Sequence, residues 1–126
     1  MSSKMLVMYS PQLLDHFEHP RNVGDVAGPD ASVQLENPAC GDILKLSARI
    51  VNGKIVEIRF RAKGCVPAMA CASLITEMAQ GRSLSELQRL EATDVAKGIG
   101  GLPAASGHAS HLAIDAIRAL IGKFQH

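Results

Sequence analysis

Aromatic residues are scarce in this sequence, which has three Phe, one Tyr and no Trp among its 126 residues. Proteins that bind single-stranded nucleic acid stack bases on aromatic side chains, so the composition argues against that class of function. The chain also has no large excess of one charge. It contains 13 Lys and Arg and 12 Asp and Glu, which gives a formal net charge of +1. No strong electrostatic field therefore attracts nucleic acid or an anionic membrane surface.

Long apolar runs and a disulfide framework are absent as well. No run approaches the roughly 20 apolar residues of a membrane helix. The opening "MSSKMLVMYS" has only a short apolar patch and no cleavage-site pattern of a secretory signal. The 3 cysteines are an odd number, which argues against paired disulfides. We predict a cytoplasmic protein that binds no membrane and keeps its cysteines free for metal or redox chemistry.

The length of the chain suits one domain spanning residues 1–126. Its first clear local signal is Ser10 followed by Pro11, which predicts an N-cap and a first helical residue. A short helix should follow over 12–19, and Pro20 should end it.

Three strands should come next. Residues 31–37 and 42–51 alternate apolar and polar side chains, which predicts half-buried strands. Asn52 and Gly53 are a strong signal for a hairpin turn into a third strand over 54–64. Consecutive strands joined in this way form an antiparallel meander. The side chains expected on the inner face of the third strand are Ile55 or Val56, Ile58, Phe60 and Ala62.

The second half of the chain changes to a helical period. The expected helices cover 66–81, a short segment after the capping-box pair Ser83 and Glu86, another short segment from Thr93, and 110–124. Strands followed by helices predict an α+β fold, a three-stranded antiparallel sheet with helices packed on one face.

The stretch "NPACGD" places Cys40 and Asp42 in one turn between the first two strands. Gly41 allows the backbone to turn sharply there and to approach another group. The two side chains would then offer a thiolate and a carboxylate on the same turn. The alternative is a plain connection with an Asx turn at Asp42.

Cys65 lies where the third strand ends and the next helix begins, in "KGCVPAMACAS". Free N–H groups and the positive end of a helix favour a thiolate at such a position. The alternative is a small buried residue at a crossover. Cys71 falls inside an alanine-rich helical face, and we predict that it only packs in the core.

His108 and His111 stand three residues apart in "SGHASHLAIDAI", so a helix would bring them onto nearby faces. A lone histidine at a helix end is more often a cap or a surface residue. His16, His19 and His126 occur in a polar helix and at the chain end, and we expect them to be solvated.

The candidates are thus two cysteines, one aspartate and one or two histidines, all at the ends of predicted elements. One sheet-and-helix sandwich could present them at a common edge. Thiolate, imidazole and carboxylate together suit Zn²⁺, Fe²⁺ or an iron–sulfur cluster.

Four motifs of the chain, in this order, resemble the scaffold proteins of iron–sulfur cluster assembly, IscU and the NifU amino-terminal domain. "DHFEHPRNVG" (15–24) looks like the opening helix and its following signature, and "NPACGD" (37–42) like the first cysteine motif. The segments 63–77 and 102–117 look like the second and third motifs. The resemblance covers nearly the whole chain.

The resemblance implies a protein that assembles a [2Fe–2S] cluster. Sulfur would come from a cysteine desulfurase, and the cluster would pass to acceptor apo-proteins. Carried over, the ligands fall on Cys40, Cys65 and a third cysteine, with Asp42 and His108 close by. The resemblance also implies that zinc can occupy this place in the resting protein. Such a protein is a scaffold and not an enzyme.

Two departures from the family pattern stand out. Where the family has His-Cys-Ser, this chain has His108, Ala109 and Ser110, so the third cysteine is absent. Where the family often has Leu-Pro-Pro-Val-Lys, which a dedicated chaperone grips, this chain has "LPAAS" (102–106), so the resemblance does not extend to that chaperone interaction.

The remaining set is Cys40, Asp42, Cys65 and His108. Four ligands complete a tetrahedral Zn²⁺ or Fe²⁺ site. A [2Fe–2S] cluster needs two ligands on each iron, and histidines can replace cysteines there. Asp42 would be a hard and labile ligand, which suits a cluster donor.

Three functions follow from these residues. The first is a cluster-assembly scaffold. The second is a zinc- or iron-binding relative that docks and regulates a cysteine desulfurase without building clusters. The third is an enzyme with Cys65 and His108 as a nucleophile pair, for which the sequence has no local signature.

Overall fold

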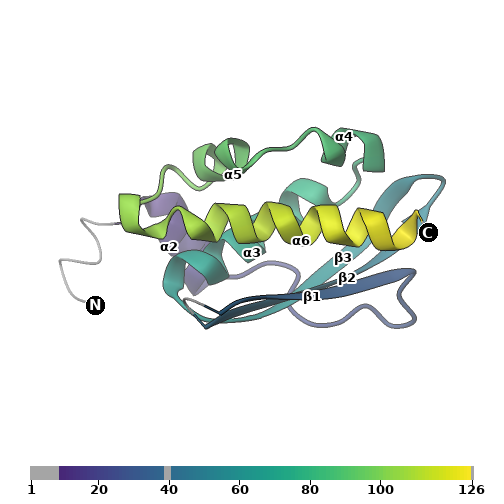
Figure 1. The fold of residues 1–126 in the computed structure, drawn as a ribbon, viewed down its shortest axis with the longest axis horizontal. Helices are drawn as coiled ribbons and strands as arrows, with labels where there is room; N and C mark the ends of the chain where they lie inside the picture. The colour runs from purple at the N-terminus through teal and green to yellow at the C-terminus, as the bar shows by residue number, and fades with distance from the viewer. Residues whose placement is uncertain (1–8, 39–40, 126) are drawn as a thin grey trace.

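The three strands form one antiparallel sheet in the order β1-β2-β3. The computed structural model describes residues 9–38 and 41–125. The strands are β1 (Ala31–Asn37), β2 (Asp42–Val51) and β3 (Lys54–Lys63), as the alternation predicts to within one residue (Figure 1). Asn52 and Gly53 connect β2 to β3 with φ of 52° and 74°. Two successive positive φ values are those of the tight hairpin turn that matches strand twist.

A β-bulge in β3 decides which side chain enters the core at its start. Arg49 pairs with Glu57, whereas the next residue, Ile50, pairs with Ile55. Val56 is therefore the extra residue on β3, and the alternation shifts by one position there. As a result Ile55 is fully buried, while Val56 is 47% exposed.

The helices cover one face of the sheet (Figure 1). α6 packs on β1 and β2, α3 packs on β3 and on α6, and α2 packs on α3. This arrangement confirms the α+β class with helices on one face. Within the described residues, no helix is both long and apolar enough to cross a bilayer. The helices are α2 (Pro11–Glu18), α3 (Val66–Ala79), α4 (Leu84–Gln88), α5 (Ala92–Gly98), the 3₁₀ turn η1 (Ala104–Ser106) and α6 (His108–Phe124).

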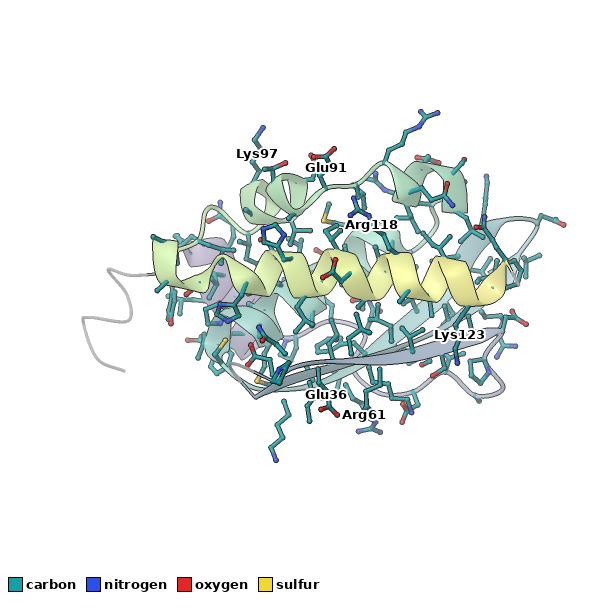
Figure 2. All side chains as sticks on the ribbon, in the orientation of Figure 1. Glu36, Arg61, Glu91, Lys97, Arg118 and Lys123 are labelled. Atoms are coloured by element: carbon teal, nitrogen blue, oxygen red, sulfur yellow. The ribbon has the colours of Figure 1, made fainter. Side chains whose placement is uncertain are left out.

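The opposite face of the sheet carries polar side chains and residues 25–30, after Val23 has bridged to Phe60 at the edge of β3. The backbone N–H of Val26 donates to the Ser47 hydroxyl at 2.9 Å, which fixes this segment against β2. Asp25 accepts a hydrogen bond from Arg61 at 2.6 Å. Arg61 points away from the helices in Figure 2.

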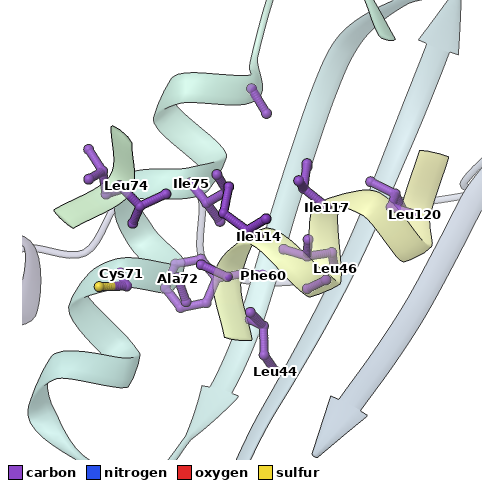
Figure 3. Close-up of a cluster of buried hydrophobic side chains, with 14 of the residues drawn as sticks. Leu44, Leu46, Phe60, Cys71, Ala72, Leu74, Ile75, Ile114, Ile117 and Leu120 are labelled. Atoms are coloured by element: carbon purple, nitrogen blue, oxygen red, sulfur yellow. The ribbon is translucent and has the colours of Figure 1, made fainter. Parts of the chain in front are cut away.

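The core lies between the sheet, α3 and α6. Figure 3 shows apolar side chains of β2 and β3 meeting those of the two helices. Cys71 belongs to this core, because it is fully buried and its burial raises the pKa of the thiol to about 12. The structure confirms that Cys71 packs as a small apolar residue. The core members labelled in Figure 3 include Leu44, Leu46, Phe60, Ala72, Ile75, Ile114, Ile117 and Leu120.

Local capping signals set the starts of α2 and α4. The Ser10 hydroxyl accepts from the Leu13 N–H at 2.9 Å, and the expected capping box joins Ser83 and Glu86. α6 begins at His108, two residues before the predicted start. His108 is therefore the first residue of the helix, which fixes its position on the end of a rigid element.

His16 is not solvated as expected, and that prediction was wrong. Its side chain is buried between α2 and α3, where Nδ1 lies 2.8 Å from the Ser73 hydroxyl. Nε2 lies 3.5 Å from the Glu77 carboxylate. The reason is the packing of α2 on α3, which the polar sequence of α2 does not reveal. His19 is exposed as predicted, and His126 lies outside the described residues.

We predict that His16 makes the protein less stable in acid. Burial and the charge of Arg21 lower the pKa of His16, against the opposing effects of Glu77 and Asp15. In the unfolded chain this histidine has a pKa of about 6.5. As the pH falls through that value, the unfolded chain therefore binds more protons than the native state. Stability should therefore decline between about pH 7 and pH 5, and His16→Gln should flatten this decline.

The measurement is urea unfolding at a series of pH values, with His19→Gln as the matched control. His19 is exposed and three residues away in the chain, so its loss should leave the slope unchanged. An unchanged slope in His16→Gln would show that other groups carry the acid sensitivity.

Candidate metal centre

Three chain segments bring metal-ligating side chains to one end of the sheet. Asp42 is the first residue of β2, Cys65 is the N-cap residue of α3, and His108 is the first residue of α6. In Figure 1 these element ends lie together on the left of the molecule. Because α3 and α6 both pack on the sheet, their first residues are held in place relative to the start of β2.

The ligand atoms of Asp42, Cys65 and His108, which we call the ligand trio, all lie within 4.8 Å of one another. Cys65 Sγ is 3.7 Å from Asp42 Oδ2 and 3.7 Å from His108 Nε2. His108 Nε2 is 3.3 Å from Asp42 Oδ2. Metal–ligand bonds of about 2.0–2.3 Å at tetrahedral angles place ligand atoms about 3.3–3.8 Å apart. The spacing of the trio therefore fits a tetrahedral Zn²⁺ or Fe²⁺ ion.

Burial differs across the trio. The Asp42 side chain is 1% exposed, whereas that of His108 is 27% exposed. Asp42 Oδ1 accepts the backbone N–H of Cys65 at 3.1 Å, which leaves Oδ2 facing the other two ligand atoms. A buried carboxylate is costly unless it is paired, and a bound cation would satisfy the oxygen that faces the trio.

The prediction that the helix end favours a Cys65 thiolate was wrong for the protein without metal. Burial raises the pKa of Cys65, and the Asp42 carboxylate raises it further. The backbone N–H of Ala68, in the first turn of α3, lowers the pKa but does not outweigh these effects. A bound cation changes this balance, because a coordinating thiol is deprotonated.

Cys40, the fourth predicted ligand, lies outside the described residues. Its position in the chain is two residues before Asp42, in the connection from β1 to β2. Asn37 pairs with Asp42 across the two strands. The Gly41 N–H donates to the Asn37 carbonyl at 2.7 Å, and these contacts join the two ends of the connection. Cys40 as a ligand therefore remains a prediction from the sequence.

The other candidates lie beside the trio. His111 is exposed on α6 and is not a member of the cluster. It lines a hollow together with His108, Glu36 and Asp115. Ala109, at the position of the missing cysteine, is 1% exposed and packs in the core.

One site residue was not assigned a role from the sequence. Gly64 precedes Cys65 with a φ of +150°, and a Cβ added there would lie 2.1 Å from Asp42 Oδ1. The glycine thus allows the carboxylate to approach the backbone. The available signal was a glycine at the end of a strand directly before a candidate ligand.

The chain matches the family model of the NifU-like N-terminal domain over residues 8–126. It is 40% identical over 114 residues to the iron-sulfur cluster assembly scaffold protein IscU 1 of Archaeoglobus fulgidus, covering 90% of this chain and 74% of the relative. It is 41% identical over 121 residues to the scaffold protein IscU of Escherichia coli, covering 93% and 94%.

A solved structure supports the fold independently. The N-terminal NifU-like protein of Brucella abortus superposes with a TM-score of 0.79 at 18% identity, and the match covers 98% of each chain. At that identity the likeness concerns the fold. Family model, sequence relatives and fold agree over nearly the entire chain, and the protein therefore belongs to the NifU-like N-terminal domain family.

Proposed function

We propose that the protein is a scaffold for iron–sulfur cluster assembly, which binds iron and a transient [2Fe–2S] cluster and transfers the cluster to acceptor apo-proteins. The observation that carries the proposal is the convergence of Asp42, Cys65 and His108 from three separate segments. Relatives that bear the name of iron-sulfur cluster assembly scaffold are about 40% identical over most of the chain, which supports the same role.

The proposed ligands are Cys40, Asp42, Cys65 and His108. Four protein ligands supply two for each iron of a [2Fe–2S] cluster, and imidazole can stand in for thiolate in such centres. This arrangement needs no ligand at position 109, where the chain has an alanine that is buried in α6. With only two thiolates, the cluster should be held less firmly than by four.

The composition of the trio suits release as well as binding. A carboxylate is a hard ligand that favours hard cations, so it binds the sulfur-rich iron of a cluster less strongly than a thiolate does. His108 is partly exposed at the start of α6, so an acceptor can reach the cargo from that side. The buried Asp42 and the partly exposed His108 thus divide the site into an anchored side and an accessible side.

Before iron arrives, the same residues can hold zinc. The separations within the trio fit tetrahedral Zn²⁺, and a fourth ligand would come from Cys40 or water. The partners that this function requires are a cysteine desulfurase as the sulfur source and acceptor apo-proteins, in the cytoplasm. The protein would act as a template and not as an enzyme.

The other candidate function is a zinc- or iron-binding relative that regulates a desulfurase without building clusters. The missing thiol at Ala109 is the observation in its favour. The scaffold is favoured because the sequence relatives are named as scaffolds, and because the remaining residues can still supply four ligands.

Cluster formation tests the scaffold directly. Anaerobic reconstitution with iron, cysteine and a desulfurase should give the visible absorbance of a [2Fe–2S] cluster, because thiolate–iron charge transfer is intense. Cys40→Ala and Cys65→Ala should each lose this absorbance. Cys71→Ala is the matched control and should retain it, since Cys71 packs in the core. Equal absorbance in all three variants would contradict the proposal.

Sulfur transfer separates the two candidate functions. After incubation with desulfurase and cysteine, mass spectrometry should find a sulfur adduct on Cys65 or Cys40, and none on the buried Cys71. A regulator that does not build clusters would change desulfurase activity without carrying an adduct. Altered desulfurase activity with an unmodified chain would therefore favour the second function.

Zinc affinity tests the role of His108. His108→Ala should weaken Zn²⁺ binding by at least about tenfold, because it removes one ligand of a four-coordinate ion. His111→Ala is the matched control, since His111 is exposed on the next turn of α6 and should leave the affinity within about twofold of the wild type. Competition with a chelating dye measures both, and equal losses would exclude His108 as a specific ligand.

A further inference from the structure

We propose that Gly64 and the backbone N–H of Cys65 form a clamp that makes Asp42 a ligand through a single oxygen. The inference deepens the proposed function, because it rests on metal binding by the trio. It concerns how the buried carboxylate is placed, and it does not depend on whether clusters are built or transferred.

The first part of the clamp is the absence of a side chain at Gly64, which leaves room for the Asp42 carboxylate. A Cβ at position 64 would lie 2.1 Å from Asp42 Oδ1, 2.9 Å from Cγ and 3.1 Å from the Asp42 Cα. Heavy atoms do not approach so closely, so any other residue at this position would displace the carboxylate. The Asp42 side chain is 1% exposed and therefore has little free volume in which to move while keeping its place in the trio.

The second part is a hydrogen bond that distinguishes the two carboxylate oxygens. Oδ1 accepts the Cys65 N–H at 3.1 Å, beside the glycine Cα. Oδ2 faces away from this bond, at 3.7 Å from Cys65 Sγ and 3.3 Å from His108 Nε2. One oxygen is thus held by the backbone, and the other is directed to the position where a metal ion would bind.

This division has a chemical consequence. A carboxylate that is free to rotate can chelate an ion with both oxygens, which raises the coordination number. With Oδ1 engaged by the backbone, Asp42 offers one bond, as a four-coordinate site requires. The dipeptide of Gly64 and Cys65 therefore determines the positions of two ligands, because Cys65 supplies the thiol and the dipeptide backbone orients the Asp42 carboxylate. Gly64 is a positioning residue that acts through Asp42.

The test is a double-mutant cycle on metal affinity, with Co²⁺ as a spectroscopic probe. Gly64→Ala should lower Co²⁺ affinity about 10- to 100-fold, as the loss of an orienting partner does in other metal sites. In the Asp42→Ala background the same substitution should change the affinity by less than about twofold, because the group through which it acts is gone. The ligand-field spectrum should change in Gly64→Ala and not change further in the double variant.

Gly81→Ala is the matched control. Gly81 also has a positive φ, of +84°, but a Cβ there would meet nothing within 4 Å. The control therefore adds a side chain at a positive φ without displacing a carboxylate, and its Co²⁺ affinity and spectrum should equal those of the wild type.

A measurement on the metal-free protein tests the clamp separately. The Cys65 amide should exchange with solvent faster in Gly64→Ala than in the wild type, because its hydrogen bond to Asp42 is lost. If Gly64→Ala does not fold, the collision with the carboxylate predicts that adding Asp42→Ala restores folding. Failure of the double variant to fold would assign Gly64 a purely conformational role and overturn the proposal.

Two further results would overturn it. One is wild-type Co²⁺ affinity in a folded Gly64→Ala, and the other is an equal loss of affinity with and without Asp42. If the wild-type protein binds no Co²⁺ at all, metal binding by the trio fails, and the amide exchange of Cys65 still decides whether the clamp exists.

Discussion

The packing of α3 and α6 on the inner face of the sheet is the interaction on which the rest of the structure depends. Apolar side chains of β2 and β3 interlock with those of the two helices, and this buried surface supplies most of the stabilisation available to a domain of this size. Both helices begin at the end of the sheet where β2 begins. Packing that is needed for stability therefore also brings Cys65 and His108 to Asp42.

The candidate metal centre uses this placement at some cost. A carboxylate is held almost completely out of water, next to a thiol whose pKa burial raises. The buried Asp42 carboxylate needs a partner, whereas the Cys65 thiol is favoured in its neutral form when no cation is bound. In the proposed function, a bound cation would pair with this carboxylate, and the hard oxygen ligand would let sulfur-bound iron leave again. Assembly and release are opposite requirements, and the proposed mixed ligand set would serve both.

The substitution at Ala109 fits into this arrangement without disturbing the fold. The alanine is buried in the first turn of α6, where it contributes to the core, and the neighbouring His108 retains its place at the helix end. The family resemblance implies a cysteine at this position, where the chain has a buried alanine, so the proposed coordination rests on the residues that the sheet and helices bring together. The chain thus belongs to the NifU-like N-terminal domain family and has an alanine at position 109.

Local signals in the sequence were sufficient for most elements. The alternation over β1 and β2 and the turn at Asn52 and Gly53 depend on residues close in the chain, so the strands and their hairpin could be predicted. The capping box at Ser83 is likewise local. The bulge at Val56 could not be predicted, because an alternation of apolar residues does not show where one residue is left unpaired.

The site required the tertiary structure. Asp42 and Cys65 are 23 residues apart and Cys65 and His108 are 43 apart, so no local pattern fixes their distances. The sequence by itself determined the candidate ligand types and their positions at the ends of elements. Only the packed fold decided that three of them meet, that His16 is buried, and that the Cys65 thiol has a raised pKa. The reason is that burial and close approach depend on which helix lies against which strand, and long-range packing decides that.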